Sequence, residues 1–267
     1  MSHELLYYIK PLIVKPKYKK HGEVTFYINK KLVDKNDEIA LTLMYICDRK
    51  LFGMAYRILM SAYYEKMGKD SGVLICPFVN SNKIFPNLNF PGDVDLLIIP
   101  YESNKLIVSK SLAIEVKVIR AKFIKQQKSP NDFGFSQAQG LLDAGFPYVA
   151  VMHLIISDQS PEDKWKEVMM SRVINADTGE IELIGTVKQD MMPVDLMERA
   201  YGRLNTNCPN DNLGLLASYL ELKETKGKWF PEGRSSNFNA KSSKDTLDKI
   251  ADFYYRHFEL FMDTSKW

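Results

Sequence analysis

The chain has 267 residues, of which 45% are apolar and 26% charged, so it can bury the core of one large domain, alone or with an appendage. The formal net charge is +3, which is compatible with a polyanionic partner but does not require one. No uncharged apolar run approaches the roughly 18 residues needed to cross a bilayer. The three cysteines are far apart and lack the spacing of a disulfide framework or a zinc site. The N-terminal sequence lacks the layout of a signal peptide, and we therefore expect a cytoplasmic protein with no membrane partner.

The first part of the chain predicts strands followed by a helix. The runs LLYYI and VTFYINKKLV, within residues 1–36, have the composition of short strands. Residues 37–67 have apolar residues at roughly helical spacing, and Asp37 or Asn36 could cap the start of a long helix there.

The middle of the chain predicts a sheet. Three apolar runs are typical of strands, and the polar turn at 102–105 predicts that the second and third form a hairpin. A polar loop then leads to a helix that Gly145 ends, and a continuous apolar run predicts a buried strand. The three runs are 72–79, 93–100 and 111–119, the loop is 120–134, the helix is 135–145 and the buried strand is 148–156.

The last third has a weaker pattern. A hairpin is expected around Asp177-Thr178-Gly179, helices over 193–204 and 244–262, and either strand or helix over 213–222. The polar segment 225–245 is predicted to be a mobile loop. We expect an α/β fold with a mixed central sheet flanked by helices. Its divisions would be N-terminal strands (1–36), a core (37–160) and a C-terminal extension packed on or beside that core (161–267).

Ionisable residues interrupt two of the apolar strands. Asp93 and Asp95 lie two residues apart, as do Glu115 and Lys117, so each pair shares one face of its strand. The midpoint of Asp95 and Glu115 is position 105, close to the centre of the predicted turn. A hairpin would therefore bring these two carboxylates nearly opposite one another, on strands about 4.8 Å apart.

Such a pair of acids suits a divalent cation. Two close carboxylates repel, and one pKa rises unless positive charge intervenes. Mg²⁺ or Mn²⁺ supplies that charge at bond lengths of about 2.0–2.5 Å, and Lys117 could orient a water or stabilise a phosphate. Glu-x-Lys on an amphipathic strand is otherwise a common solvated pattern. The apolar neighbours Ile114, Val116 and Val118 favour the functional interpretation.

The segments Gly92-Asp93-Val94-Asp95-Leu96-Leu97 and Ala113-Ile114-Glu115-Val116-Lys117 resemble the core of the PD-(D/E)xK nuclease superfamily, and the order of elements over 37–156 is similar to that of the family. The resemblance implies a restriction-endonuclease-like fold. It also implies that Asp95, Glu115 and the Val116 carbonyl bind Mg²⁺ or Mn²⁺ and that Lys117 is catalytic. Asp93 is the alternative to Asp95, but the GxxD spacing favours Asp95. The resemblance covers less than half of the chain.

Some relatives carry a further ligand or substrate residue on a helix. RecB-like members have a glutamine after the catalytic strand, followed four residues later by tyrosine. Gln137 is the favoured match and Gln139 the other, but this chain lacks the tyrosine. Other members use a glutamate of the first helix. Glu38 and Glu65 are the candidates for that role, and both are expected to be surface charges.

Basic and aromatic residues follow the catalytic strand. Arg120, Lys122, Lys125 and Lys128 could contact phosphates or could form a solvated loop. Phe133 and Phe135 could stack on bases, although anchoring in the core is the favoured role. The second Glu-x-Lys, at Glu221-Leu222-Lys223, is discounted because its upstream acid, Asp211, is only ten residues away in a segment of Asn and Pro. His153 is expected to be a hydrogen-bonded core residue.

These observations predict a Mg²⁺-dependent nuclease, with DNA favoured over RNA as the substrate. Two alternatives are a non-catalytic module on the same fold that binds nucleic acid or a protein, and a subunit of a larger assembly. A homodimer is compatible with the sequence. Phosphate-binding motifs of the forms GxxxxGK[ST] and GxGxxG are absent, so nucleotide cofactors have no support.

Overall fold

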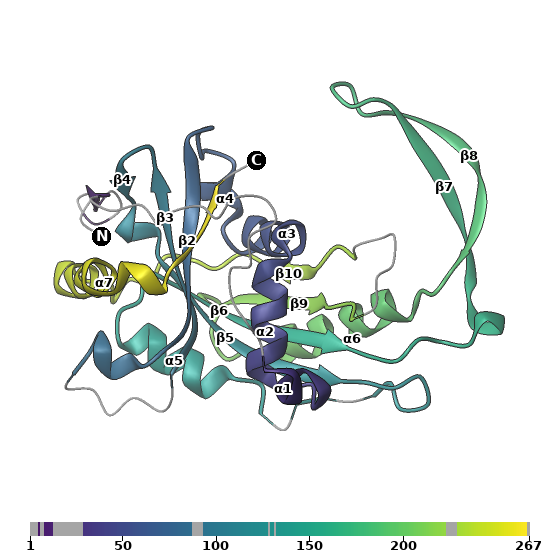
Figure 1. Ribbon diagram of the computed structural model, residues 1–267, viewed down its shortest axis with the longest axis horizontal. Helices are drawn as coiled ribbons and strands as arrows, with labels where there is room; N and C mark the ends of the chain where they lie inside the picture. Colours follow the sequence, from purple (N-terminus) through teal and green to yellow (C-terminus); the bar gives the residue numbers. More distant parts are fainter. Residues whose placement is uncertain are drawn as a thin grey trace.

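The computed structural model describes residues 5, 8–12, 29–86, 93–127, 129–130, 132–222 and 229–265. Across these ranges the chain forms a nine-stranded mixed sheet in the order β1-β4-β3-β5-β6-β9-β10, with β2 beside β3 and β11 beside β2 (Figure 1). The strands are β1 (Lys10–Pro11), β2 (Ser71–Val79), β3 (Val94–Glu102), β4 (Lys105–Leu106), β5 (Leu112–Arg120), β6 (Tyr148–Ile156), β9 (Gly214–Tyr219), β10 (Glu232–Arg234) and β11 (Met262–Ser265).

The centre of this sheet matches the pattern of apolar runs. The predicted strands are confirmed as β2, β3, β5 and β6; β3 pairs antiparallel with both β2 and β5, and β5 pairs parallel with β6. The predicted turn is confirmed at Ser103 and Asn104. It leads first into β4, which pairs with the end of β3, and a 3-10 turn at Val108–Lys110 precedes β5.

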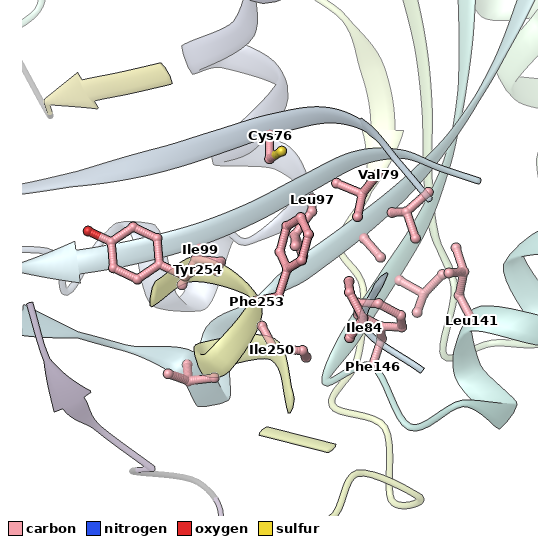
Figure 2. Packing of buried hydrophobic residues seen from close by; sticks show 14 of the residues in the cluster. Cys76, Val79, Ile84, Leu97, Ile99, Leu141, Phe146, Ile250, Phe253 and Tyr254 are labelled. Atoms are coloured by element: carbon pink, nitrogen blue, oxygen red, sulfur yellow. The ribbon is translucent and has the colours of Figure 1, made fainter. Parts of the chain in front are cut away.

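Helices cover both faces of the sheet. They are α1 (Lys30–Asp34), α2 (Glu38–Cys47), α3 (Arg49–Leu59), α4 (Ser61–Tyr64), α5 (Phe135–Asp143), α6 (Met192–Asn207) and α7 (Lys244–His257). Helices α2 and α3 pack on one face, and α5 and α7 pack on the other. Figure 2 shows the second layer, where Ile250 and Phe253 of α7 lie near Leu97 and Ile99 of β3, and Leu141 of α5 lies on the side of Ile84 and Phe146 in the same cluster. Helix α6 covers a separate part of that same face, over Ile119 and Ile155.

The predicted single helix over 37–67 is wrong. Asp37 caps its start as expected, because its side chain accepts a hydrogen bond from the backbone N–H of Ile39. The helix ends at Cys47, where Asp48 accepts from the N–H of Leu51 and starts α3. A side chain that caps a new helix competes with continuation of the old one. The apolar residues keep their helical spacing across this break, and the spacing alone therefore predicted one helix.

Other predictions needed correction near the ends of the chain. Residues 30–34 are helical instead of extended, and residues 13–28 lie outside the described part. The segment 225–245 contains strand β10, and the last predicted helix ends at His257, after which β11 pairs with β2.

The C-terminal third belongs to the same sheet as the predicted core. The ambiguous segment 213–222 contains strand β9, which pairs parallel with β6. Tyr45 of α2 donates a buried hydrogen bond to Ser218 of β9. No helix in the described ranges has the length and apolar character to span a membrane.

The predicted hairpin around 177–179 is confirmed as β7 (Lys166–Asn175) and β8 (Glu180–Gln189), which form a separate two-stranded sheet. This ribbon extends away from the body of the molecule (Figure 1).

Candidate active site

The predicted acids and lysine lie on the sheet face that carries α5, α6 and α7. On β5, Ala113 belongs to the core beneath α5 and α7, and Ile119 belongs to the core beneath α6. Glu115 and Lys117 lie between them on the same face, because alternate residues of a strand share a face. The charged pair therefore occupies the interval between two helix-covered cores.

One edge of β5 is open at this point. The recorded pairs with β3 stop at Leu96↔Ile114, and the same register continued by one residue places Asp95 opposite Glu115. Beyond this point carboxylates take the place of a partner strand. The N–H of Val116 donates to Asp95 Oδ2 at 2.7 Å, and the N–H of Val118 donates to Glu38 Oε2 at 3.2 Å.

Glu115 is buried, with 1% of its surface exposed, and it forms an ion pair with Lys117. The distance from Lys117 Nζ to Glu115 Oε1 is 2.8 Å. Gly134, immediately before α5, closes over both side chains. It has a φ of +85°, and a Cβ there would lie 2.9 Å from Glu115 Cγ and 3.4 Å from Lys117 Cγ. The glycine thus permits close approach as well as an unusual backbone angle.

The electrostatics of the site favour added positive charge. The pKa of Asp95 is raised to about 6 and that of Glu115 to about 7, in each case mainly by burial. Neighbouring carboxylates act in the same direction: Glu38 and Asp93 on Asp95, and Asp95 and Glu38 on Glu115. For Lys117, burial lowers the pKa, but the hydrogen bond to Glu115 and the three surrounding carboxylates outweigh it, so its pKa is raised. The Lys117 ammonium is therefore charged, and its single positive charge only partly neutralises the carboxylates of Asp95, Glu115 and Glu38.

Glu38 is the residue that sequence reasoning undervalued. Its expected role as a surface charge is wrong, because it is half-buried and hydrogen-bonded to the strand that carries Glu115 and Lys117. The sequence signal that could have identified Glu38 is its position directly after Asp37, the residue that caps α2. The other candidate, Glu65, is exposed and lies 3.8 Å from Arg57, as a surface charge would.

A cavity of about 310 Å³ opens beside the acids. Lys117 and Glu38 reach its wall, whereas Asp95 and Glu115 do not form part of the lining. The lining residues are Glu38, Lys117, Val118, Ile119, Arg120, Ser129, Pro130 and Asp132. The cavity thus offers space for a ligand directly next to the lysine and the first-helix glutamate.

The candidate substrate residues have different positions. Arg120 lines the cavity, but its guanidinium donates through Nε and Nη2 to the carbonyl of Asn36, just before the cap of α2. Lys122 is exposed in the loop and does not line the cavity. Asp93 is exposed at the start of β3. Lys128, Lys223 and Gly92 lie outside the described residues.

The helix and strand next to the site carry two buried polar atoms without a hydrogen-bond partner among the described residues, Gln137 Oε1 and His153 Nδ1. Gln139 instead bonds to Asp143 and Asn210. His153 of β6 lies beside Lys117 of β5. Burial lowers the pKa of His153 to about 4, so its imidazole is neutral. Its Nε2 lies 3.3 Å from the carbonyl of Phe133.

Phe133 and Phe135 stack on each other, with ring centroids 5.6 Å apart, and pack against the core beneath α5 and α7. This position matches the favoured prediction that they anchor the core, as opposed to contacting bases.

The donor set of the site fits a hard cation. Among the described residues, no three acidic, histidine or cysteine side chains gather closely enough to hold an ion alone. Mg²⁺ does not need such a cage, since it commonly uses one or two carboxylates and keeps several waters. Asp95, Glu115 and the Val116 carbonyl provide oxygen donors. That carbonyl shares the open edge with its own N–H, as in any strand.

Two acids and a charged lysine beside a cavity would, with a bound divalent cation, supply the groups used in metal-assisted hydrolysis of a phosphodiester. Comparison of the chain with protein-family models, with curated proteins and with solved structures finds no match.

Proposed function

We propose that the protein is a metal-dependent nuclease of the PD-(D/E)xK type, with a restriction-endonuclease-like core, that hydrolyses phosphodiester bonds in DNA. One observation carries the proposal. Where β3 stops pairing with β5, the carboxylates of Asp95 and Glu38 bind the exposed N–H groups of the strand that bears Glu115 and Lys117. A solvated surface pattern would leave these acids exposed and unconnected.

Electrostatics support a cation at this place. The pKa values of Asp95 and Glu115 are raised chiefly by burial and then by neighbouring carboxylates, so their charged forms are costly without a positive partner. Mg²⁺, when bound, would neutralise the carboxylates, polarise a phosphate and favour ionisation of water. Asp95, Glu115 and the Val116 carbonyl would hold it.

The residues of the chain have distinct roles in this proposal. The N–H of Val116 orients the Asp95 carboxylate. Lys117, held by Glu115, presents an ammonium at the wall of the cavity, where it stabilises negative charge on the phosphate. Glu38 fixes the open edge of β5 and faces the same cavity. Gly134 above Glu115 and Lys117 limits their movement and excludes water from one side.

A cleavage assay on plasmid, linear and single-stranded DNA tests the proposal, with Mg²⁺ or Mn²⁺ against EDTA. Asp95→Asn, Glu115→Gln and Lys117→Met should each lower the rate by about 100-fold or more, as loss of one charge-stabilising group does elsewhere. Glu65→Gln is the matched control, since it removes an exposed carboxylate outside the site, and it should retain the rate of the wild type.

The proposal fails if the wild type cuts no DNA with either metal. It also fails if an Asp95→Ala, Glu115→Ala double variant keeps full activity. RNA included as a competitor separates the related alternative, because cleavage of RNA alone would reassign the substrate. Metal-independent binding of DNA without cleavage would instead favour a non-catalytic module.

A further inference from the structure

Among the described residues, no other strand pairs with the ribbon of β7 and β8. All but two of its strand residues are exposed. Eight large aliphatic side chains on it are between 39% and 67% exposed: Met169, Met170, Val173, Ile174, Ile181, Leu183, Ile184 and Val187. An isolated two-stranded hairpin is marginally stable in water, so a ribbon of this composition needs a surface to cover it.

Both faces of the ribbon are apolar. Met169 and Met170 are adjacent in a regular stretch of β7, so they point to opposite faces. Pairing across the ribbon places Val187 on the face of Met170, and Leu183, Val173 and Ile181 on the face of Met169, whereas Ile174 and Ile184 lie at β-bulges. The sheet contains only these two strands, so each strand also has an unpaired outer edge. Folding the ribbon back onto its own body would cover just one of these faces.

The base of the ribbon holds it in place. Asp190 accepts hydrogen bonds from the N–H groups of Ser160 and Met192, and these bonds connect the chain segment before the ribbon with the segment after it. Trp165 Nε1 donates to the carbonyl of Ser160, and Lys166 lies 3.6 Å from Asp195 of α6. The ribbon is thus attached as a projecting arm, which we define as residues 166–189.

Charge indicates what kind of partner the arm accepts. It carries three basic and four acidic residues, so its net charge does not attract a polyanion. Glu167 is opposite Lys188, and Arg172 is opposite Glu182, so opposite charges face one another within the ribbon. The exposed side chains that are left to contact a partner are mainly apolar, which fits a protein surface as the partner.

We propose that the arm binds a second copy of this chain and makes the protein a homodimer. A two-fold axis brings the same apolar surface of each copy onto its mate, so the contact is self-complementary. When the mate covers both faces of the arm, its twenty strand residues match the roughly 20–30 residues per side of a stable interface. This inference is independent of the proposed nuclease activity.

Light scattering coupled to size-exclusion chromatography tests it on the full chain at about 50 µM, above the roughly micromolar Kd at the weak end for interfaces of this size. The wild type should have twice the monomer mass of 30.8 kDa. An Ile181→Lys, Leu183→Lys double variant should have the monomer mass. Both residues are already exposed, at 58% and 60%, so their charge is tolerated by the fold.

The matched control is Phe230→Lys with Leu260→Lys, which changes two exposed apolar residues outside the arm. It should remain dimeric. A chain in which two glycines replace residues 166–189 provides a second monomer and guards against misfolding of the lysine variant, with circular dichroism as the check. A monomeric wild type overturns the proposal, and so does a dimer that survives in both arm variants or dissociates equally in the control. A monomeric wild type whose DNA binding is lost with the arm substitution assigns the arm to nucleic acid instead.

Discussion

Glu115 is a buried acid whose charge costs folding free energy. Its pKa of about 7 in the folded chain exceeds the ordinary value of 4.5, because burial and then Asp95 disfavour the carboxylate. Between these pH values the folded state binds more protons than the unfolded state. The contribution of Glu115 to the free energy of unfolding is therefore present below about pH 4.5 and is lost as the pH rises through 7.

We therefore expect Glu115→Gln to be more stable than the wild type at pH 8 in EDTA, by about 3.5 kcal/mol at roughly 1.4 kcal/mol per pKa unit. The difference should vanish near pH 4, where the carboxyl is protonated. Urea unfolding at the two pH values measures it.

Glu65→Gln, which changes an exposed acid, should show no such difference. Adding Mg²⁺ at pH 8 should stabilise the wild type and leave Glu115→Gln unchanged. A variant less stable than the wild type at pH 8 would mean that the ion pair with Lys117 outweighs the burial of its charge.

At the scale of elements, the turn into α5 controls how closely the helix approaches β5. Gly134→Ala adds a Cβ 2.9 Å from Glu115 Cγ at a φ of +85°. The left-handed backbone alone costs about 1–2 kcal/mol for a residue with a Cβ, and the steric contact must also move Glu115. We expect lower stability together with about 10-fold or greater loss of cleavage.

Gly179→Ala is the matched control, because its φ is +73° and nothing lies within 4 Å of the added Cβ. It should show the backbone cost in thermal unfolding with cleavage unchanged. Equal activity in the two variants would contradict the packing role of Gly134.

Helix α2 positions Glu38 through its N-terminal cap. Removing the cap by Asp37→Ala should lower the free energy of unfolding by about 1 kcal/mol. It should also reduce cleavage, because Glu38 follows the cap directly and binds the N–H of Val118. Chemical denaturation and cleavage rates measure the two effects.

Asp48→Ala removes the equivalent cap of α3, which lies away from the acids. The same loss of stability with full cleavage is expected. A similar loss of cleavage in both variants would show that stability alone explains the effect of Asp37→Ala.

At the scale of the whole molecule, the sheet depends on both ends of the chain. Strand β9 separates β6 from β10, and β11 covers the outer edge of β2. Truncation after Ser160 would expose the edge of β6 and remove the partner of Tyr45. We expect this fragment to lack a cooperative thermal transition by circular dichroism.

Deletion of the arm is the contrasting change, since Lys166 and Gln189 are paired neighbours at its base and a short link can join the ends. The arm-deleted chain should keep a cooperative transition. Cooperative unfolding of the 1–160 fragment would instead show that the predicted core is an independent domain.

Local patterns predicted much of the central sheet. The alternation of apolar residues in β3 and β5 and the turn at Ser103 and Asn104 depend on neighbours in sequence, and they placed Asp95 opposite Glu115. The contact of Glu38 with Val118 could not be predicted in this way, because 80 residues separate them. The break at Asp48 was missed because a capping side chain does not alter the spacing of apolar residues.

The sequence by itself determined the central strands β2, β3, β5 and β6, the register around the acids and the types of chemical group that these strands carry, because these follow from period-two patterns and a local turn. Only the tertiary structure decided which remote elements complete the site and the sheet. It brought Glu38 to the open edge of β5, placed Gly134 over Glu115, and inserted β9 and β11 from the last third of the chain. The physical reason is that packing and strand pairing between distant segments depend on the whole chain closing around its core, and no local pattern encodes that choice.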